Sequence, residues 1–196
     1  PLEVVPDPDD RAANTNDDAW QAYTAIDQYS AEHQFVGSLM WLPAEKGRPL
    51  LKLVPDTAIW RPLTRWAYEL IRSLIEAGTD PTPPTVLAAG RHQPARDALE
   101  PATAPTANQQ QRLALYLFDA YAQAVAPSAA VGSYARTVLD DAYRRAFDTC
   151  GIRMQQLAAT VADRDELTEQ FTAIRDELAD LWRRAEDAAK PQRSRR

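Results

Sequence analysis

The chain has 196 residues, a single cysteine and a formal net charge of −6. This length suits one domain, or one domain with an appendage. One cysteine excludes an internal disulfide framework and a cysteine-based metal cluster. Only six glycines occur among abundant alanine, leucine, arginine and glutamate, which favours a helical chain.

The charge is unevenly distributed along the chain. Residues 1–30 contain seven acidic residues and one arginine, whereas the other 166 residues contain 21 acidic and 21 basic residues. The chain therefore reads as an acidic N-terminal arm joined to an electrically balanced body. Such a body lacks the concentrated positive charge that binds duplex DNA or an anionic membrane, so direct nucleic-acid binding is not expected to be its main activity.

Neither a membrane anchor nor a secretion signal is expected. The longest apolar stretch, residues 35–42, is far shorter than the roughly 20 residues that a membrane-spanning helix needs. The first residues lack the basic start and the apolar segment of a signal peptide. We therefore expect a cytoplasmic protein with no membrane partner.

The first predicted elements follow an acidic arm. Residues 1–17 are expected to be disordered, because this proline- and aspartate-rich segment cannot bury enough apolar surface to offset the entropy of ordering. Trp20, Tyr23 and Ile26 recur at three-residue steps and indicate that a helical head begins near residue 18. A second candidate helix covers residues 32–42 and is ended by proline.

The most regular helix of the head is predicted in the next segment. Before it, the apolar run at residues 50–54 fits either a short helix or an extended piece. Pro62 then occupies the first turn of a helix whose apolar residues alternate at steps of three and four. Gly78 is the natural stop for this helix.

The head continues through two more predicted helices to residue 127. Thr82 is a possible N-cap for a short helix at residues 85–89. A proline-rich loop at residues 90–107 follows. From residue 107 another amphipathic helix runs to Pro127, which closes the predicted head at residues 18–127.

The last third predicts two long helices. Ser128 is placed to cap the first, in which apolar residues recur at alternating steps of three and four, the spacing of a helix–helix seam. Asp163 and Glu166 form a start signal for the second, which has the same spacing. Because only a tight turn separates them, the helices should fold back antiparallel over residues 128–188, before a basic tail at residues 189–196. The predicted fold is all-α, with a multi-helix globular head followed by a long antiparallel αα-hairpin.

The hairpin carries more apolar side chains than two helices can cover. Those left over should pack on the head or on another chain. We therefore expect self-association, as a dimer or higher oligomer, through the hairpin. The candidate oligomer interface consists of Phe147, Met154, Leu157, Leu167, Phe171, Ile174, Leu178, Leu181 and Trp182.

No catalytic, cofactor-binding or metal-binding set emerges from the sequence. His33 and His92 belong to no metal-binding spacing, and Cys150 lies among heptad neighbours as a small core residue. The glycines never approach the spacing of a phosphate-binding loop. We therefore expect a chain that is not an enzyme and needs no cofactor or metal.

Three strings, together with Thr85 and Val86 at the family's distance after the second, resemble the N-terminal domain of replicative hexameric helicases of the DnaB type. Residues 31–42 resemble its opening, in which a glutamate precedes an apolar-glycine-small-leucine run. Residues 60–78 look like its next block, where an aromatic residue and a proline precede a long amphipathic helix that ends in glycine. Residues 127–138 look like the block that opens its helical hairpin, and Arg145 falls where that family usually has an arginine. The order and spacing of the strings agree over residues 31–188.

The chain also departs from the family pattern. Thr64 stands where the family commonly has histidine, and Thr82 stands where it commonly has a capping aspartate. Val131 replaces a usual asparagine, and residues 90–110 are not recognisable. These departures are expected of either a standalone relative or a diverged fragment of a helicase.

The resemblance implies an all-α domain that forms a collar by hairpin pairing and helps to dock primase and loader proteins. The 196 residues contain no counterpart of the motor domain of those helicases, so we expect no helicase activity. The leading interpretation is a noncatalytic protein-interaction and oligomerisation module linked to DNA replication. The alternatives are a standalone regulator that binds helicase, primase or loader, and a weak single-stranded nucleic-acid binder that uses the head or the basic tail.

Overall fold

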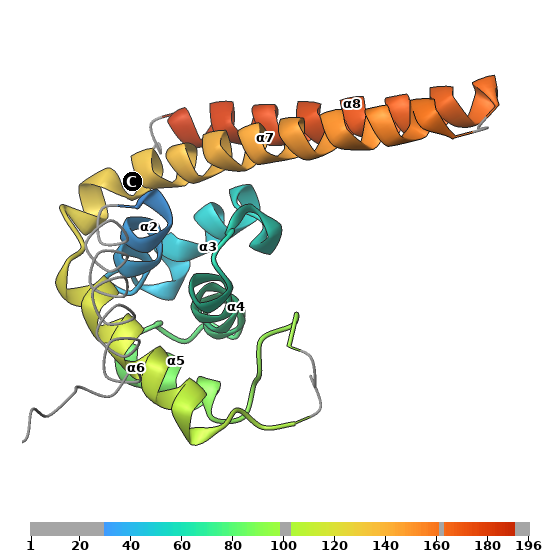
Figure 1. Ribbon diagram of the computed structural model, residues 1–196. Helices are drawn as coiled ribbons and strands as arrows, with labels where there is room; N and C mark the ends of the chain where they lie inside the picture. The colour runs from blue at the N-terminus through green and yellow to red at the C-terminus, as the bar shows by residue number, and fades with distance from the viewer. Residues whose placement is uncertain (1–29, 99–102, 161–162, 191–196) are drawn as a thin grey trace, which may run out of the picture.

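The computed structural model describes residues 30–98, 103–160 and 163–190 (Figure 1). Within these ranges every regular element is a helix, which confirms the all-α prediction. No helix in the same ranges is long and apolar enough to cross a bilayer. The elements are α2 (Ala31–Leu39), α3 (Ala44–Leu53), the 3-10 helix η1 (Asp56–Ala58), α4 (Pro62–Glu76), α5 (Pro83–Gly90), α6 (Ala107–Ala122), α7 (Pro127–Ala159) and α8 (Arg164–Ala189).

The predicted acidic arm at residues 1–17 and the helical spacing at residues 18–29 lie outside the described residues. So does most of the predicted basic tail, from residue 191 onward. The boundary between head and hairpin at residue 128 stays a prediction.

The core of the head surrounds α2. This helix packs against α4, α6 and α7, and its apolar residues Phe35, Val36 and Leu39 are fully buried. Ser30 fixes the start of the helix, because its hydroxyl accepts a hydrogen bond from the backbone N–H of His33 at 3.3 Å. The helix is buried on all sides, so its polar residues Glu32, Gln34 and Ser38 are buried as well.

The apolar stripe predicted after Pro62 is observed as α4. Proline occupies the first turn, and the helix ends before Gly78, whose φ of 78° lies in the left-handed region that favours glycine. Leu70, Ile71 and Ile75 are fully buried. The run at residues 50–54, for which periodicity allows two interpretations, belongs mostly to α3.

The helices α2 and α6 cross at very close range. A Cβ atom built on Gly37 would lie 2.1 Å from the backbone oxygen of Ala120. Only glycine fits where two helix backbones approach so closely. This contact places the buried residues Leu113 and Leu117 of α6 in the core of the head.

The start of α7 differs from the prediction. The helix begins at Pro127, and Ala126 is its N-cap residue, with a left-handed φ of 46°. Ser128 therefore lies in the first turn, and its prediction as the cap was wrong. A proline at the first helical position already has the φ that a helix needs, so the helix begins one residue earlier. The preceding helix α6 is also shorter than predicted and ends at Ala122.

Other helix starts follow their local chemistry. Asp163 accepts a hydrogen bond from the backbone N–H of Glu166 at 2.9 Å, as predicted for the start of α8. Thr106 and Gln109 form a reciprocal capping box at the start of α6, which the prediction did not include. Thr82 does occupy the N-cap position of α5, but its side chain makes no capping hydrogen bond.

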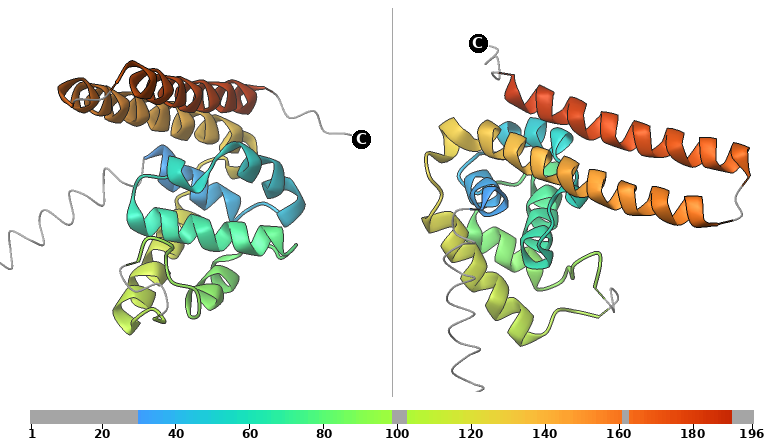
Figure 2. Two further views of the ribbon diagram at one scale, coloured as in Figure 1. Left: turned by 90° about the vertical axis from the view of Figure 1, so that its right-hand side faces the viewer. Right: turned by 45° about the horizontal axis from the view of Figure 1, so that its top comes forward.

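The long helices α7 and α8 lie side by side and run in opposite directions (Figures 1 and 2). The first part of α7 lies across α2, where Val138 and Leu139 are fully buried. Near its C-terminus, α8 packs against both α3 and α7, and Ala185 and Ala188 are buried there. The other end of the helix pair projects beyond the head.

Candidate interaction site

An apolar groove runs along the pair α7 and α8. It has a volume of about 470 Å³. Both helices line it, so its shape depends on how they pack together. The lining residues are Tyr143, Phe147 and Met154 from α7 and Phe171, Ile174, Arg175, Leu178, Ala179 and Trp182 from α8.

The groove exists because two packed helices bury only the faces that meet in the seam between them. Cys150 and Ile174 lie in that seam and are 3% and 2% exposed. Apolar residues on the adjoining faces have no third layer to cover them. As a result Phe147, Phe171 and Trp182 remain 60%, 57% and 60% exposed. Aromatic side chains at such exposure leave a large apolar surface uncovered.

Six of the nine predicted interface residues line the groove, and three do not. Leu157 is half-buried near the projecting end, and Leu167 is exposed outside the groove. Leu181 packs partly against the core of the head. Ile174 lines the groove from within the seam, so it forms part of the floor.

Three groove residues were missed by the sequence prediction. Tyr143 stands four residues before Phe147, and their rings are 6.4 Å apart in a tilted contact. The same spacing rule, extended by one step, would have found this tyrosine. Arg175 and Ala179 occupy the same face of α8 but carry too little apolar character to stand out in the pattern.

Arg175 is the one charged residue among the described residues that line the groove. Its Nε and Nη2 atoms donate to the Oδ1 atom of Asp176 at 3.1 and 3.0 Å. Both side chains are more than half exposed. Arg175 therefore lines the groove while its charged end is held by a neighbouring carboxylate.

Arg145 joins α7 to the head. Its Nη2 atom donates to the backbone oxygen of Ala58 at 2.6 Å and lies 3.6 Å from the Oε1 atom of Glu32. Glu32 also accepts hydrogen bonds from the backbone N–H groups of Trp60 at 2.8 Å and Arg61 at 3.3 Å. One buried carboxylate thus connects α2, α7 and the segment before α4.

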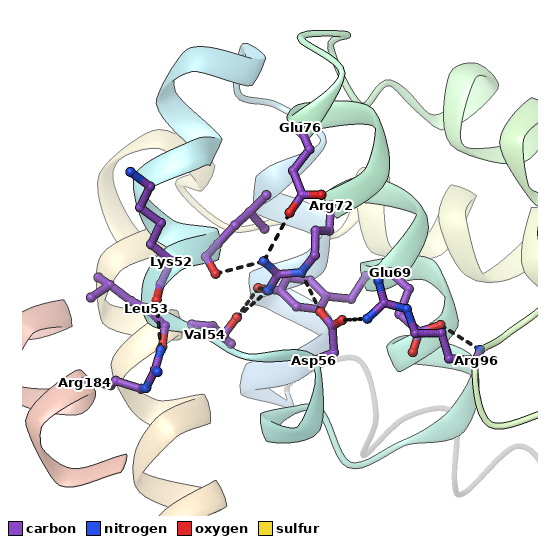
Figure 3. A network of polar contacts seen from close by, with 11 residues as sticks. Lys52, Leu53, Val54, Asp56, Glu69, Arg72, Glu76, Arg96 and Arg184 are labelled. Atoms are coloured by element: carbon purple, nitrogen blue, oxygen red, sulfur yellow. Dashed lines mark hydrogen bonds and ion pairs between the residues drawn. The ribbon is translucent and has the colours of Figure 1, made fainter. Parts of the chain in front are cut away.

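Arg184 makes the corresponding connection from α8 (Figure 3). Its Nη1 atom donates to the backbone oxygens of Lys52 at 2.9 Å and Leu53 at 3.4 Å. Its Nε atom donates to Asp180 at 2.5 Å, which orients the guanidinium and lowers the pKa of that carboxyl. The last carbonyls of a helix lack intrahelical partners, so the end of α3 is a natural acceptor for this arginine.

A second polar cluster ties α4 to its neighbours (Figure 3). Arg72 donates to the backbone oxygens of Leu51 at 3.1 Å and Val54 at 2.8 Å, and its Nε atom donates to Asp56 at 2.6 Å. Asp56 also accepts from Arg96 at 2.8 Å. These partners are backbone carbonyls and ion pairs, so the cluster serves to hold the segment after α3 and the loop after α5 in place.

The two histidines and the cysteine lie in three different environments. His33 is buried with its ring edge-on to Tyr116, at 5.3 Å between ring centres, and His92 is exposed. Burial raises the pKa of the Cys150 thiol, which keeps it in the weakly nucleophilic thiol form. Within the described ranges no three histidine, cysteine or acidic residues come together as a metal site.

Comparison with known proteins gives one informative match. No family model matches the chain, and no curated protein matches it. A similar solved structure is the crystal structure of the N-terminal domain of DnaB helicase from Mycobacterium tuberculosis. It is 22% identical, with a TM-score of 0.55 over 76% of this chain and 95% of that chain. The chain has the fold of the DnaB helicase N-terminal domain.

The strings that resemble the DnaB-type domain meet in this fold. Residues 31–42 contain α2, residues 60–78 contain α4, and residues 127–138 open α7. The contacts of Glu32 and Arg145 lie where these three helices come together. In this chain the two residues therefore form a polar joint between these three segments.

Proposed function

We propose that the chain is a noncatalytic interaction module of DNA replication that self-associates through the apolar groove of α7 and α8. The observation that carries this proposal is the presence of three aromatic side chains, each more than half exposed, in one groove. The similarity to a helicase N-terminal domain supports the link to replication.

The size of the exposed surface suits a dimer. Complete burial of an aromatic side chain covers about 150–250 Å², and the three rings are each about 60% exposed, so they offer on the order of 350 Å² of apolar surface per copy. Two copies face to face would then bury about 700 Å² from these side chains alone, compared with the roughly 1,000 Å² of the smallest specific interfaces. Flanking residues add to this area.

A second copy of the chain is the occupant that suits the groove best. Twofold pairing places the same face of each copy in contact, so an apolar surface meets an apolar surface. Eight of the nine described lining residues are uncharged, and the ninth is already paired with Asp176. A nucleic acid would instead require unpaired positive charge along its path.

The test is to replace the two most exposed α8 aromatics together, as Phe171→Ser and Trp182→Ser. Light scattering after size-exclusion chromatography should give a dimer for the unchanged chain and a monomer for the double variant. Both rings are exposed, so circular dichroism should stay close to that of the unchanged chain, and so should the melting temperature at concentrations where both chains are monomeric.

The matched control is Phe118→Ser on α6, where an equally large ring is 70% exposed but lies outside the groove. This variant should remain a dimer. A monomeric unchanged chain at high concentration, or a folded double variant that remains dimeric, would contradict the proposal. Binding to helicase, primase or loader stays a prediction. Mixing the chain with each of these proteins in turn and testing for co-purification checks it.

A further inference from the structure

Arg175 and Asp176 occupy a special place on the groove. Arg175 lies four residues after Phe171 and three before Leu178, so its stem lies on the same face of α8 as these apolar side chains. Its guanidinium nevertheless makes two hydrogen bonds with the carboxylate of Asp176, the next residue along the helix. The charged end is therefore drawn away from the apolar lining.

We propose that Arg175 and Asp176 form a gate that sets how tightly a second copy of the chain occupies the groove. This inference rests on the proposed self-association. Arg175 opposes docking, because covering the groove removes water from a guanidinium. Asp176 reduces that penalty, because it holds the charge at the rim and leaves only the aliphatic stem in the contact.

The ring of Phe171 makes the role of Asp176 specific. Residues four apart on a helix are neighbours, and a guanidinium released from its carboxylate is attracted to an exposed aromatic face. Without Asp176, the Arg175 side chain would fold over Phe171 and cover part of the groove. The carboxylate therefore keeps the aromatic lining open to a partner.

If Arg175 and Asp176 act in this way, the dimer affinities of their variants should follow a definite order, which sedimentation velocity on the full chain measures. Arg175→Met keeps the stem but removes the charge, so the dimer should dissociate at roughly tenfold lower concentration. Asp176→Ala should weaken the dimer several-fold. The double variant should match Arg175→Met alone, because Asp176 acts only through Arg175.

The matched control is the neighbouring ion pair of Arg183 with Asp180, whose arginine does not line the groove. Arg183→Met should leave the dimer affinity unchanged. Equal melting temperatures of the variants as dilute monomers would show that the affinities do not reflect misfolding. A roughly uniform dimer affinity across all variants, or additive effects in the double variant, would contradict the proposed role of Arg175 and Asp176 and leave self-association intact.

If the unchanged chain and Arg175→Met were both monomeric, the proposed function itself would be contradicted.

Discussion

Glu69 is a buried carboxylate of α4, and its burial has an energetic cost. The residue is 3% exposed, and its Oε2 atom accepts a hydrogen bond from the backbone N–H of Arg96 at 3.0 Å. Burial raises the pKa of Glu69, and the nearby carboxylates of Asp56 and Asp97 act in the same direction. The ionised side chain is therefore less stable in the folded chain than in the unfolded one.

Glu69→Gln should raise the melting temperature at pH 7 by a few degrees. The amide oxygen still accepts the bond from Arg96, and no charge is buried. Because the folded pKa lies above the unfolded value, the folded chain binds more protons between the two, and the cost of Glu69 grows as pH rises through this window. The gain should therefore be larger at pH 7 than at pH 4 and vanish at still lower pH, where Glu69 is protonated in both states.

Scanning calorimetry at pH 7 and pH 4 measures this difference. Glu76→Gln is the control, because its side chain is 62% exposed and lies 3.7 Å from Arg72. It should change the melting temperature little at pH 7. If Glu69→Gln lowers the melting temperature at pH 7, the carboxylate contributes more through its hydrogen bond than its burial costs.

At the scale of elements, the crossing of α2 and α6 depends on one glycine. Gly37→Ala would push the helices apart, because the added Cβ would overlap a backbone oxygen that cannot move independently. We expect a loss of about 2–3 kcal/mol in the free energy of unfolding. Urea denaturation followed by circular dichroism measures it.

Gly151→Ala in α7 is the matched control, since nothing lies within 4 Å of the position that its new methyl group would occupy. In an open helix interior, alanine should instead stabilise the fold by about 0.5–1 kcal/mol. Equal stabilities of the two variants would show that the α2–α6 contact is looser than the crossing implies.

The sequence predicts the helices themselves well, but it predicts fewer of the contacts between them. Pro62 with its apolar stripe and Asp163 with Glu166 are local signals, and both mark helices that are observed. Ser128 failed as a cap because a neighbouring proline decided the same boundary. Six groove residues followed from spacing alone, whereas Arg175 is polar and invisible to a count of apolar residues.

Long-range polar partners could not be predicted in this way. Arg145 pairs with a carbonyl 87 positions earlier in the chain, and Arg184 reaches one 132 positions earlier. Nothing in the local spacing of either arginine identifies such partners. The family resemblance marked Arg145 as a position of interest, and the structure supplies its physical reason.

At the scale of the whole molecule, Arg145 connects the long helices with the head. Arg145→Ala would remove the bond to Ala58 and leave Glu32 with less positive charge near it. We expect a loss of about 2–3 kcal/mol in the free energy of unfolding, because a buried carboxylate loses part of its compensation.

Chemical denaturation of Arg145→Ala and Arg144→Ala compares two adjacent arginines on α7. The Arg144 side chain is 80% exposed and lies 3.8 Å from Asp141, so its loss should cost less than about 0.5 kcal/mol. Similar stabilities of the two variants would contradict a joint at Arg145. The comparison separates a general effect of charge on α7 from the specific contact with the head.

The single cysteine offers a way to follow motion in the native state. Cys150 lies in the seam between α7 and α8, so a thiol reagent can reach it only after the two helices separate locally. Labelling rates under native conditions therefore report the free energy of that opening, separately from global unfolding. A second copy bound over the adjoining groove should slow the labelling. The labelling rate of Cys150 therefore measures both the local opening of the helix pair and its assembly with a second copy.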